Sequence, residues 1–348
     1  MGNHIYGIIR ASEKISFNPV GISGEGDMVY AIPYQDIAAL ISSSPSLAYD
    51  SVPKETLVRY LALHQAVMEG VMKNYTVIPM KFGTTARNEE EVEKILESGY
   101  SKFKDVLGRM DDKIELEMVA LWNNLDSTLK EIGREERIKK FKEKVATKSA
   151  EKILSAKIEL GKMVKSLLDE KRAKVGGQIM DELKKWVIDF HNHDILDDTM
   201  IMNTAFLVNK HREKDFERAI NYLNKKYKDK INFRIIGPLP PYSFSTLELK
   251  RIKFEKIKEA AKILDLGEET TLSEVKQAYR NLTRRFHPDR NPQDPNARKR
   301  FEKISEAYHT LIDYYSDGEG CFKEKKNKDL VMIKILEISK GLDLNSVI

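Results

Sequence analysis

The tripeptide His287-Pro288-Asp289, followed by Arg290, places an imidazole, a rigid ring and a carboxylate side by side. An imidazole can act as a general base or bind a metal ion. No second metal ligand and no nucleophile lies nearby in the sequence, so we favour neither a catalytic nor a metal-binding interpretation. The tripeptide instead predicts a loop whose polar side chains are presented to another molecule.

Two helical patterns flank this loop. Upstream, Thr271 with Glu274 three residues later forms a capping box, which marks a helix start. Apolar residues then recur at helical spacing: Leu272, Val275, Ala278, Tyr279, Leu282 and Phe286. Downstream the same spacing links Ala297, Phe301, Ile304, Tyr308 and Leu311. The prolines from Pro288 to Pro295 fix φ in the intervening loop, so the sequence predicts an antiparallel helical hairpin with a stiff, exposed tip.

The upstream helix carries a basic stripe. Lys276, Arg280 and Arg284 are four residues apart and so share one helix face, with Arg285 beside them. Between residues 272 and 300, eight basic residues stand against three acidic ones, a local charge of +5 that would steer an acidic partner. The alternatives are an ordinary solvated face and a nucleic-acid surface. The latter ranks last because the stripe is short and lacks interleaved stacking aromatics.

The segment from about residue 255 to 315 resembles a J-domain, the module that activates DnaK-type ATPase chaperones. The resemblance lies in residues 260–266, 276–280, 284–292 and 301–308. It implies that Pro288 holds the turn rigid, that Asp289 presents its carboxylate to a chaperone arginine, and that His287 shapes the loop and adds a donor. It also implies chaperone contacts for the basic stripe. A J-domain triggers ATP hydrolysis in a separate protein, so we expect no catalytic residue here and no enzyme.

Composition sets broad limits. The 348 residues, with a formal charge of +5, 41% hydrophobic and 32% charged residues, suit two or three domains rich in exposed helix. The single cysteine, Cys321, excludes an internal disulfide framework and a cysteine-based zinc site. No apolar run is long enough for a bilayer, and the N-terminus lacks a signal pattern. We expect a cytoplasmic protein without cofactor, metal, membrane or nucleic-acid partner.

The first 110 residues predict an α+β domain. Strands are expected over 5–9, 28–32 and 77–84, and helices over 53–73 and from Asn88 to about Met110. The glycines between Gly21 and Asp27 indicate a hairpin turn, since a phosphate-binding loop would end in lysine and serine or threonine. His64 lies on the apolar face of its helix and is interpreted as a hydrogen-bonded core histidine rather than a metal ligand.

Residues 111–248 predict a ferredoxin-like domain. The order is a strand (114–122), a helical insertion (about 134–190), a strand pair that includes 202–208, a helix around Phe216, and a last strand (231–236). Gly176-Gly177 is expected to break the insertion, whose pattern resumes through Phe190. Its charged faces are either solvated or a partner-binding arm. The pair His191 and His193 with Asp194 lacks a third spaced ligand, so we do not favour a metal site.

A second resemblance covers roughly residues 4–248. The stretches Val77-Ile78-Pro79-Met80-Lys81-Phe82-Gly83-Thr84 and Gly237-Pro238-Leu239-Pro240-Pro241-Tyr242-Ser243-Phe244 look like the two signatures of the gas vesicle GvpF/GvpL family. Leu239 stands where the family usually has tryptophan, which removes an aromatic anchor. The family implies an accessory or minor structural role in gas vesicle assembly. Candidate contacts with the shell protein are Pro240, Pro241, Tyr242 and Phe244.

Together these patterns predict an α+β chain with an N-terminal α+β domain (1–110), a ferredoxin-like domain with a long helical insertion (111–248), an all-α J-domain hairpin (255–316) and a tail (317–348). The tail is expected to form one amphipathic helix bearing Val331, Ile335, Ile338 and Leu342. The expected function is gas vesicle assembly in the cytoplasm, through a shell protein of the GvpA type, other gas vesicle accessory proteins and a DnaK-type chaperone. The alternatives are a minor wall component and a general co-chaperone.

Overall fold

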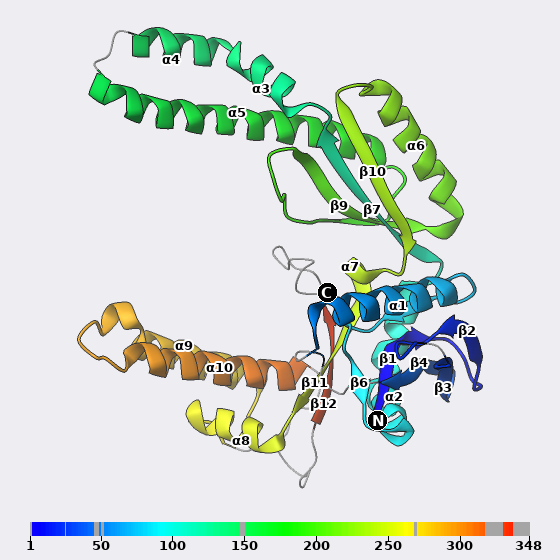
Figure 1. The fold of residues 1–348 in the computed structure, drawn as a ribbon. Helices are drawn as coiled ribbons and strands as arrows, with labels where there is room; N and C mark the ends of the chain where they lie inside the picture. Colours follow the sequence, from blue (N-terminus) through cyan, green and yellow to red (C-terminus); the bar gives the residue numbers. More distant parts are fainter. Residues whose placement is uncertain are drawn as a thin grey trace. The chain divides into compact units, whose positions relative to one another are not determined.

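The computed structural model describes residues 2–24, 26–44, 49, 52–146, 150–267, 270–316 and 330–336. Within these ranges the chain forms two compact units. The first contains residues 2–89 and 101–246, and the second contains residues 90–100 and 247–335. Figure 1 shows the helices and strands of both units.

The first unit begins with a six-stranded sheet. The order is β2-β3-β4-β1-β5, with β6 also paired to β1. The strands are β1 (Gly2–Ile9), β2 (Ser16–Val20), β3 (Met28–Tyr34), β4 (Ile37–Ser44), β5 (Val77–Pro79) and β6 (Thr85–Ala86). Helix α1 (Lys54–Met72) packs Val67, Met68 and Val71 against this sheet, and α2 (Glu89–Arg109) follows β6. Both predicted helices of this domain are therefore present.

His64 is a core histidine, as predicted. Its Nδ1 lies 3.0 Å from Nε2 of His4, and the hydroxyl of Tyr49 lies 3.2 Å from Nδ1 of His4. Both imidazoles are buried, and burial lowers the pKa of His64 to about 3 and also lowers that of His4. The pair is therefore neutral and holds β1 to α1 through a hydrogen bond.

The second sheet has the ferredoxin-like order β10-β7-β9-β8, with every neighbouring pair antiparallel. Its strands are β7 (Lys113–Trp122), β8 (Asp189–Asn192), β9 (Met200–Asn209) and β10 (Ile231–Leu239). Helix α6 (Glu213–Lys226) connects β9 to β10 and buries Phe216, Ile220 and Leu223. The predicted fold class is confirmed.

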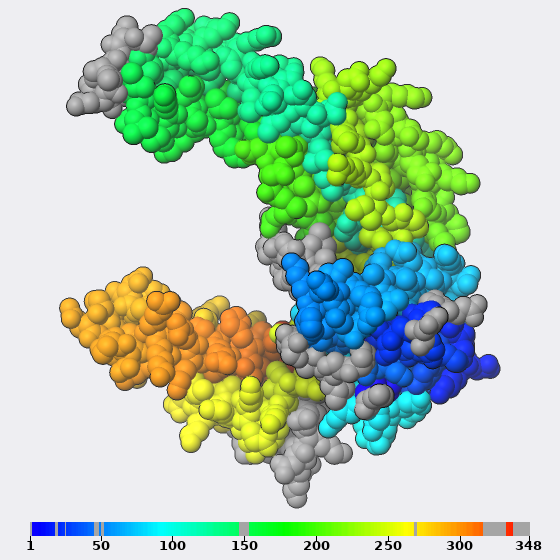
Figure 2. Space-filling view, in the orientation of Figure 1, coloured from blue at the N-terminus to red at the C-terminus, as the bar shows by residue number. Residues whose placement is uncertain are grey.

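The helical insertion connects β7 to β8. It consists of α3 (Leu125–Gly133), α4 (Glu136–Ala146) and α5 (Ala150–Leu183), and α4 runs back along α5 as an arm (Figure 1). In the space-filling view, side chains of the two helices fill the space between them (Figure 2). The predicted helical hairpin is thus present.

Two details of the insertion differ from the prediction. Helix α5 runs without a break through Gly176-Gly177, because tertiary packing of its apolar face outweighs the cost of two glycines. It ends at Leu183, and Phe190 belongs to strand β8, where it pairs with Phe206. Apolar residues three or four positions apart also occur where a turn leads into a short strand. Periodicity alone therefore placed the end of the helix too late in the chain.

The second unit contains α8 (Phe254–Ile263), α9 (Leu272–Phe286) and α10 (Ala297–Ser316) around one apolar core. It also contains strand β11 (Thr246–Ile252), which pairs with β12 (Leu330–Leu336). The prediction of a helix in the tail is wrong for Val331 and Ile335, which lie in β12. Pairing with β11 supplies this short apolar segment with backbone partners, and Met332 enters the core. Ile338 and Leu342 lie outside the described residues.

Candidate functional site

The predicted loop lies at the far end of the α9–α10 hairpin (Figure 1). Helix α9 begins with the predicted capping box: the Thr271 backbone N–H donates to Glu274 Oε2 at 2.7 Å, and the Glu274 N–H donates to Thr271 Oγ1 at 3.3 Å. The bond from the Thr271 backbone lowers the pKa of Glu274. This cap fixes where α9 starts and hence which residues its exposed face carries.

Two tyrosines set the register of the hairpin. The rings of Tyr279 and Tyr308 stack with centroids 3.9 Å apart and planes inclined by 14°. Val275 of α9 and Leu311 of α10 are fully buried beneath them. Aromatic stacking favours one sliding position of the helices over others, so the loop at the tip has a defined geometry.

The loop is a short 3₁₀ turn (η2, Pro288–Arg290) closed by hydrogen bonds. His287 Nδ1 accepts the backbone N–H of Asp289 at 3.2 Å, and its ring lies edge-on to Phe301 with centroids 5.4 Å apart. Asn291 Nδ2 donates to the carbonyl oxygens of Arg285 at 2.9 Å and of His287 at 3.0 Å. His287 therefore shapes the turn by accepting a hydrogen bond, and its predicted role as a donor to a partner stays a prediction. The sequence analysis did not predict that Asn291 stabilises the turn.

The carboxylate of Asp289 is exposed, with 86% of its side chain accessible, compared with 41% for His287. Its Oδ2 is 3.7 Å from His287 Nδ1, too long for a hydrogen bond, and that nitrogen already accepts the Asp289 N–H. The turn therefore holds Asp289 by its backbone and leaves its carboxylate available to an incoming cation.

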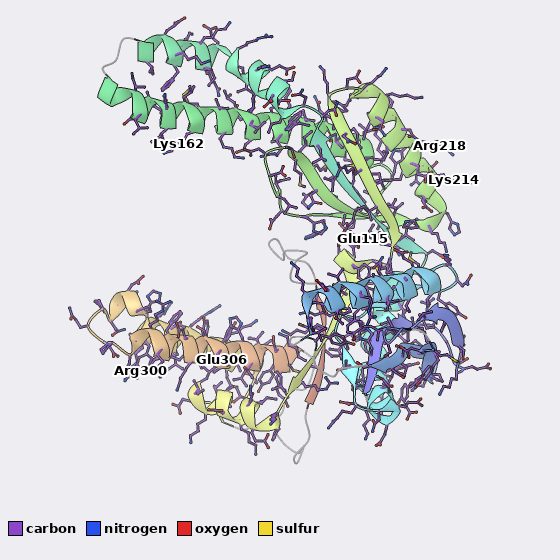
Figure 3. The ribbon with its side chains drawn as sticks, viewed as in Figure 1. Glu115, Lys162, Lys214, Arg218, Arg300 and Glu306 are labelled. Atoms are coloured by element: carbon purple, nitrogen blue, oxygen red, sulfur yellow. The ribbon has the colours of Figure 1, made fainter. Side chains whose placement is uncertain are left out.

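The basic stripe of α9 is exposed. Within the described residues, Lys276, Arg280, Arg284 and Arg285 form no ion pair with a carboxylate, whereas on α10 Arg298 pairs with Glu302 and Arg300 with Asp294, each at 3.2 Å. Figure 3 shows Arg300 near the loop end of the hairpin. The positive field is therefore concentrated on α9, next to Asp289, and this face suits an acidic surface with one embedded cation.

The four residues predicted to contact the shell protein are less exposed than the J-domain loop. Pro240 and Pro241 are buried, while Tyr242 and Phe244 are half-buried. The Tyr242 hydroxyl donates to Gln65 Oε1 at 2.9 Å. Within this segment, α7 (Tyr242–Ser245) is a single turn. Of these four residues only Tyr242 and Phe244 retain exposed surface, so the prolines serve mainly to position the segment.

The sequence analysis did not predict that a carboxyl group is buried against this segment. Glu115 on β7 is fully buried and accepts the backbone N–H of Ser243 at 2.7 Å and its hydroxyl at 2.8 Å. Burial raises the pKa of Glu115 to about 8, although both Ser243 bonds act in the opposite direction. The alternation Ile114-Glu115-Leu116-Glu117 did not indicate a buried carboxyl, because the same pattern is typical of a strand with one exposed face.

Replacing Glu115 by glutamine is expected to flatten the pH dependence of stability. The folded carboxyl keeps its proton to about pH 8, while the unfolded group has a pKa of 4.5. The folded state thus binds more protons between these values, so the wild type loses stability as pH rises, by up to about 1.4 kcal/mol per pH unit. Glutamine can accept from the Ser243 N–H and donate to its hydroxyl without titrating.

Urea denaturation at pH 5, 6.5 and 8 measures this effect. The glutamine variant should match the wild type at pH 5 and exceed it at pH 8. The matched control is Glu217→Gln on the exposed face of α6, which should retain the wild-type slope. Equal slopes for Glu115→Gln and the wild type would contradict the assignment of a protonated Glu115.

His191 and His193, which were not expected to bind a metal, lie in and just after strand β8. Among the described residues, no group of three histidine, cysteine, aspartate or glutamate side chains is placed to hold a metal ion. Where the structure describes helices, none combines the length and apolar character needed to cross a membrane.

The geometry thus defines a two-module protein: an α+β body with a ferredoxin-like sheet, and a helical hairpin with an exposed charged loop. The chain belongs to the gas vesicle synthesis protein GvpL/GvpF family, whose model matches residues 2–246, and a DnaJ domain follows at residues 261–316. Both predicted resemblances are confirmed. Neither family is an enzyme family.

Individual relatives agree with this division. Gas vesicle protein F of Haloferax mediterranei is 22% identical over 249 residues, which cover 71% of this chain and 94% of the relative. Chaperone protein DnaJ 1 of Aquifex aeolicus is 48% identical over 59 residues, 17% of this chain and 16% of that protein. The chain therefore shares only a small part of the DnaJ chaperones it matches.

Solved structures support the fold of the body. The crystal structure of GvpF from Anabaena aligns with a TM-score of 0.60 and 19% identity, covering 70% of this chain and 97% of that one. GvpF from Microcystis aeruginosa aligns with a TM-score of 0.55 at the same identity, covering 70% and 98%. Leu239, where the resemblance leads us to expect tryptophan, is buried opposite Glu115 in the β10–β7 register and so occupies an interior position.

Proposed function

We propose that this protein assists gas vesicle assembly by binding the hydrophobic shell subunit with its GvpF-like body and recruiting a DnaK-type chaperone with its J-domain. The observation that carries the proposal is the pairing, in one chain, of a GvpL/GvpF body with a hairpin that exposes Asp289 and the four basic side chains of the α9 stripe. The site of action is the cytoplasm at the growing vesicle.

The physical reason for such a pairing is aggregation. A subunit that forms a gas-tight wall must expose apolar surface before it assembles, and exposed apolar surface associates non-specifically. A body that selects the subunit, joined to a trigger for chaperone ATP hydrolysis, keeps the subunit available to the shell. Tyr242 and Phe244 are candidate contacts on the body, because neither residue is fully buried.

Sedimentation of the shell subunit tests this proposal. Denatured shell subunit is diluted into buffer with the intact chain, a DnaK-type chaperone and ATP, and the soluble fraction is measured after centrifugation. We expect the soluble fraction to be highest when all three components are present. No gain over chaperone alone would contradict the proposal, and stoichiometric retention of the chain on washed vesicles would favour a wall component instead.

A further inference from the structure

The turn that presents Asp289 is held to α9 by residues outside the His287-Pro288-Asp289 tripeptide. Helix α9 ends at Phe286, and His287 is extended with a ψ of 129°, as expected for a residue that precedes proline. The last carbonyl groups of a helix have no donor within the helix and need one from elsewhere. The donors that they find therefore decide how the turn lies relative to α9.

The side chain of Asn291 supplies two of these donors from a single amide group. Its Nδ2 donates to the carbonyl oxygen of Arg285, in the last turn of α9, at 2.9 Å, and to that of His287 at 3.0 Å. The backbone N–H of Asn291 also donates to the carbonyl oxygens of His287 and Pro288, each at 3.1 Å. Asn291 thus ties the end of α9 to the residues on both sides of the Pro288 nitrogen.

Asp294 connects the same loop to α10. Its backbone N–H donates to the carbonyl oxygen of Asn291 at 3.1 Å. Its Oδ2 accepts from Arg300 Nη1 of α10 at 3.2 Å, and its Oδ1 accepts the backbone N–H of Asn296 at 2.8 Å. A continuous series of contacts therefore runs from α9 through Asn291 and Asp294 to α10.

The remaining hydrogen bonds of the turn join its own residues. The Asp289 N–H donates to His287 Nδ1 at 3.2 Å, and the Arg290 N–H donates to the His287 carbonyl oxygen at 3.0 Å. These two bonds fix the shape of the turn, but they do not attach it to either helix. The direction in which Asp289 points therefore depends on Asn291.

The two residues that attach the loop are less exposed than the residue they hold. Asn291 and Asp294 are half-buried, whereas 86% of the Asp289 side chain is accessible. We propose that Asn291, supported by Asp294, is a positioning residue that keeps the Asp289 carboxylate in the geometry in which a DnaK-type chaperone meets it. This inference rests on the proposed function and adds two residues to the site that performs it.

A positioning residue changes affinity in a characteristic way. A loop that samples several conformations presents Asp289 correctly for only part of the time, and the apparent affinity of a partner falls in proportion to that fraction. Once the complex has formed, the same carboxylate is in the same place. Loss of Asn291 should therefore change the concentration at which the chain acts and leave its maximal effect unchanged.

Two substitutions at Asn291 isolate its donor groups. Asn291→Ala removes both side-chain bonds, and Asn291→Asp keeps the shape of the side chain but has no donor when ionised. The matched control is Gln293→Ala, which removes an exposed amide from the same loop. Phosphate release by a purified DnaK-type chaperone is measured over a range of concentrations of each intact chain.

We expect Asn291→Ala to raise the half-maximal concentration about tenfold, equivalent to about 1.4 kcal/mol, which is the size of two lost hydrogen bonds. Asn291→Asp should shift it at least as far, and Gln293→Ala should not shift it. Asp294→Ala should give a smaller shift in the same direction, because the bonds from Asn291 to α9 remain. The maximal rate should equal that of the wild type for all four variants.

Hydrogen exchange distinguishes a loosened turn from a damaged hairpin. The amide protons of Arg290 and Asn291 should exchange faster in both Asn291 variants. Those of Tyr279 and Leu311, which lie in the packed parts of α9 and α10, should keep their wild-type protection. Lost protection in both helices would assign Asn291 to folding of the whole hairpin and overturn the inference.

The kinetic outcomes separate this inference from the proposed function. A wild-type half-maximal concentration for both Asn291 variants overturns the inference and leaves the proposed function standing. A reduced maximal rate makes Asn291 a direct contact of the chaperone, which also overturns a positioning role. Failure of the wild-type chain to stimulate the chaperone overturns both.

Discussion

Replacing Asp289 by asparagine is expected to abolish stimulation of ATP hydrolysis in a DnaK-type chaperone. The carboxylate is 86% exposed, so its charge is available to a partner arginine. Truncating one member of such a charge pair typically costs 2–5 kcal/mol, which corresponds to a loss of more than about tenfold. The turn itself should survive, because it is closed by the Asp289 backbone N–H and by Asn291. The measurement is steady-state phosphate release by the chaperone at increasing concentrations of the variant.

Shell-subunit binding distinguishes a lost contact from a lost fold. Asp289→Asn should bind the shell subunit as the wild type does, because its substitution lies in the other module. The matched control is Glu302→Gln, which removes an exposed carboxylate of α10 and should retain stimulation. Full stimulation by Asp289→Asn, or simultaneous loss of both activities, would contradict separate roles for the two modules.

Reversing two charges of the basic stripe on α9 is also expected to reduce stimulation of the chaperone strongly. Arg280→Glu combined with Arg284→Glu changes the local charge by four units at positions that form no ion pair in the described structure. Complementary charge accelerates association by about 10- to 1,000-fold at low salt. We therefore expect stimulation to fall about tenfold or more at low ionic strength. Raising the salt concentration should narrow the difference between wild type and variant, since screening removes the attraction.

The matched control reverses the same spacing on another helix. Lys214 and Arg218 lie four residues apart on the exposed side of α6 (Figure 3). Lys214→Glu combined with Arg218→Glu should leave stimulation unchanged, because the change in net charge is the same but its location is not. If both double variants lose stimulation equally, the effect belongs to net charge and the α9 stripe has no special role.

The J-domain hairpin was predictable because its determinants are local. The capping box, the prolines and the apolar spacing all lie within about fifty residues, and the structure places α9, the turn and α10 where these signals indicate. The ferredoxin-like order was predictable for a similar reason: the strands alternate or are apolar, and the helices between them are long. Asn291, in contrast, braces the turn through contacts that no spacing rule encodes.

The structural features that could not be predicted from the sequence depend on contacts between residues far apart in the chain. Strand β12 forms because β11, about eighty residues earlier, offers it an edge. Glu115 is buried because the segment at Ser243 folds over β7, so its pKa depends on a contact across 128 positions. Gly176-Gly177 reads as a helix break in isolation, and only the packing of α5 shows that the helix continues. The structure also shows that a Cβ added at either glycine would meet nothing within 4 Å.

We expect this polypeptide to accelerate ATP hydrolysis by a separate chaperone. The most direct measurement is the single-turnover rate of a purified DnaK-type chaperone with the intact chain, in the absence and presence of shell subunit. We expect that the chain alone raises the rate, that shell subunit raises it further, and that His287→Gln does neither. An unchanged rate with the intact chain and shell subunit together would contradict it.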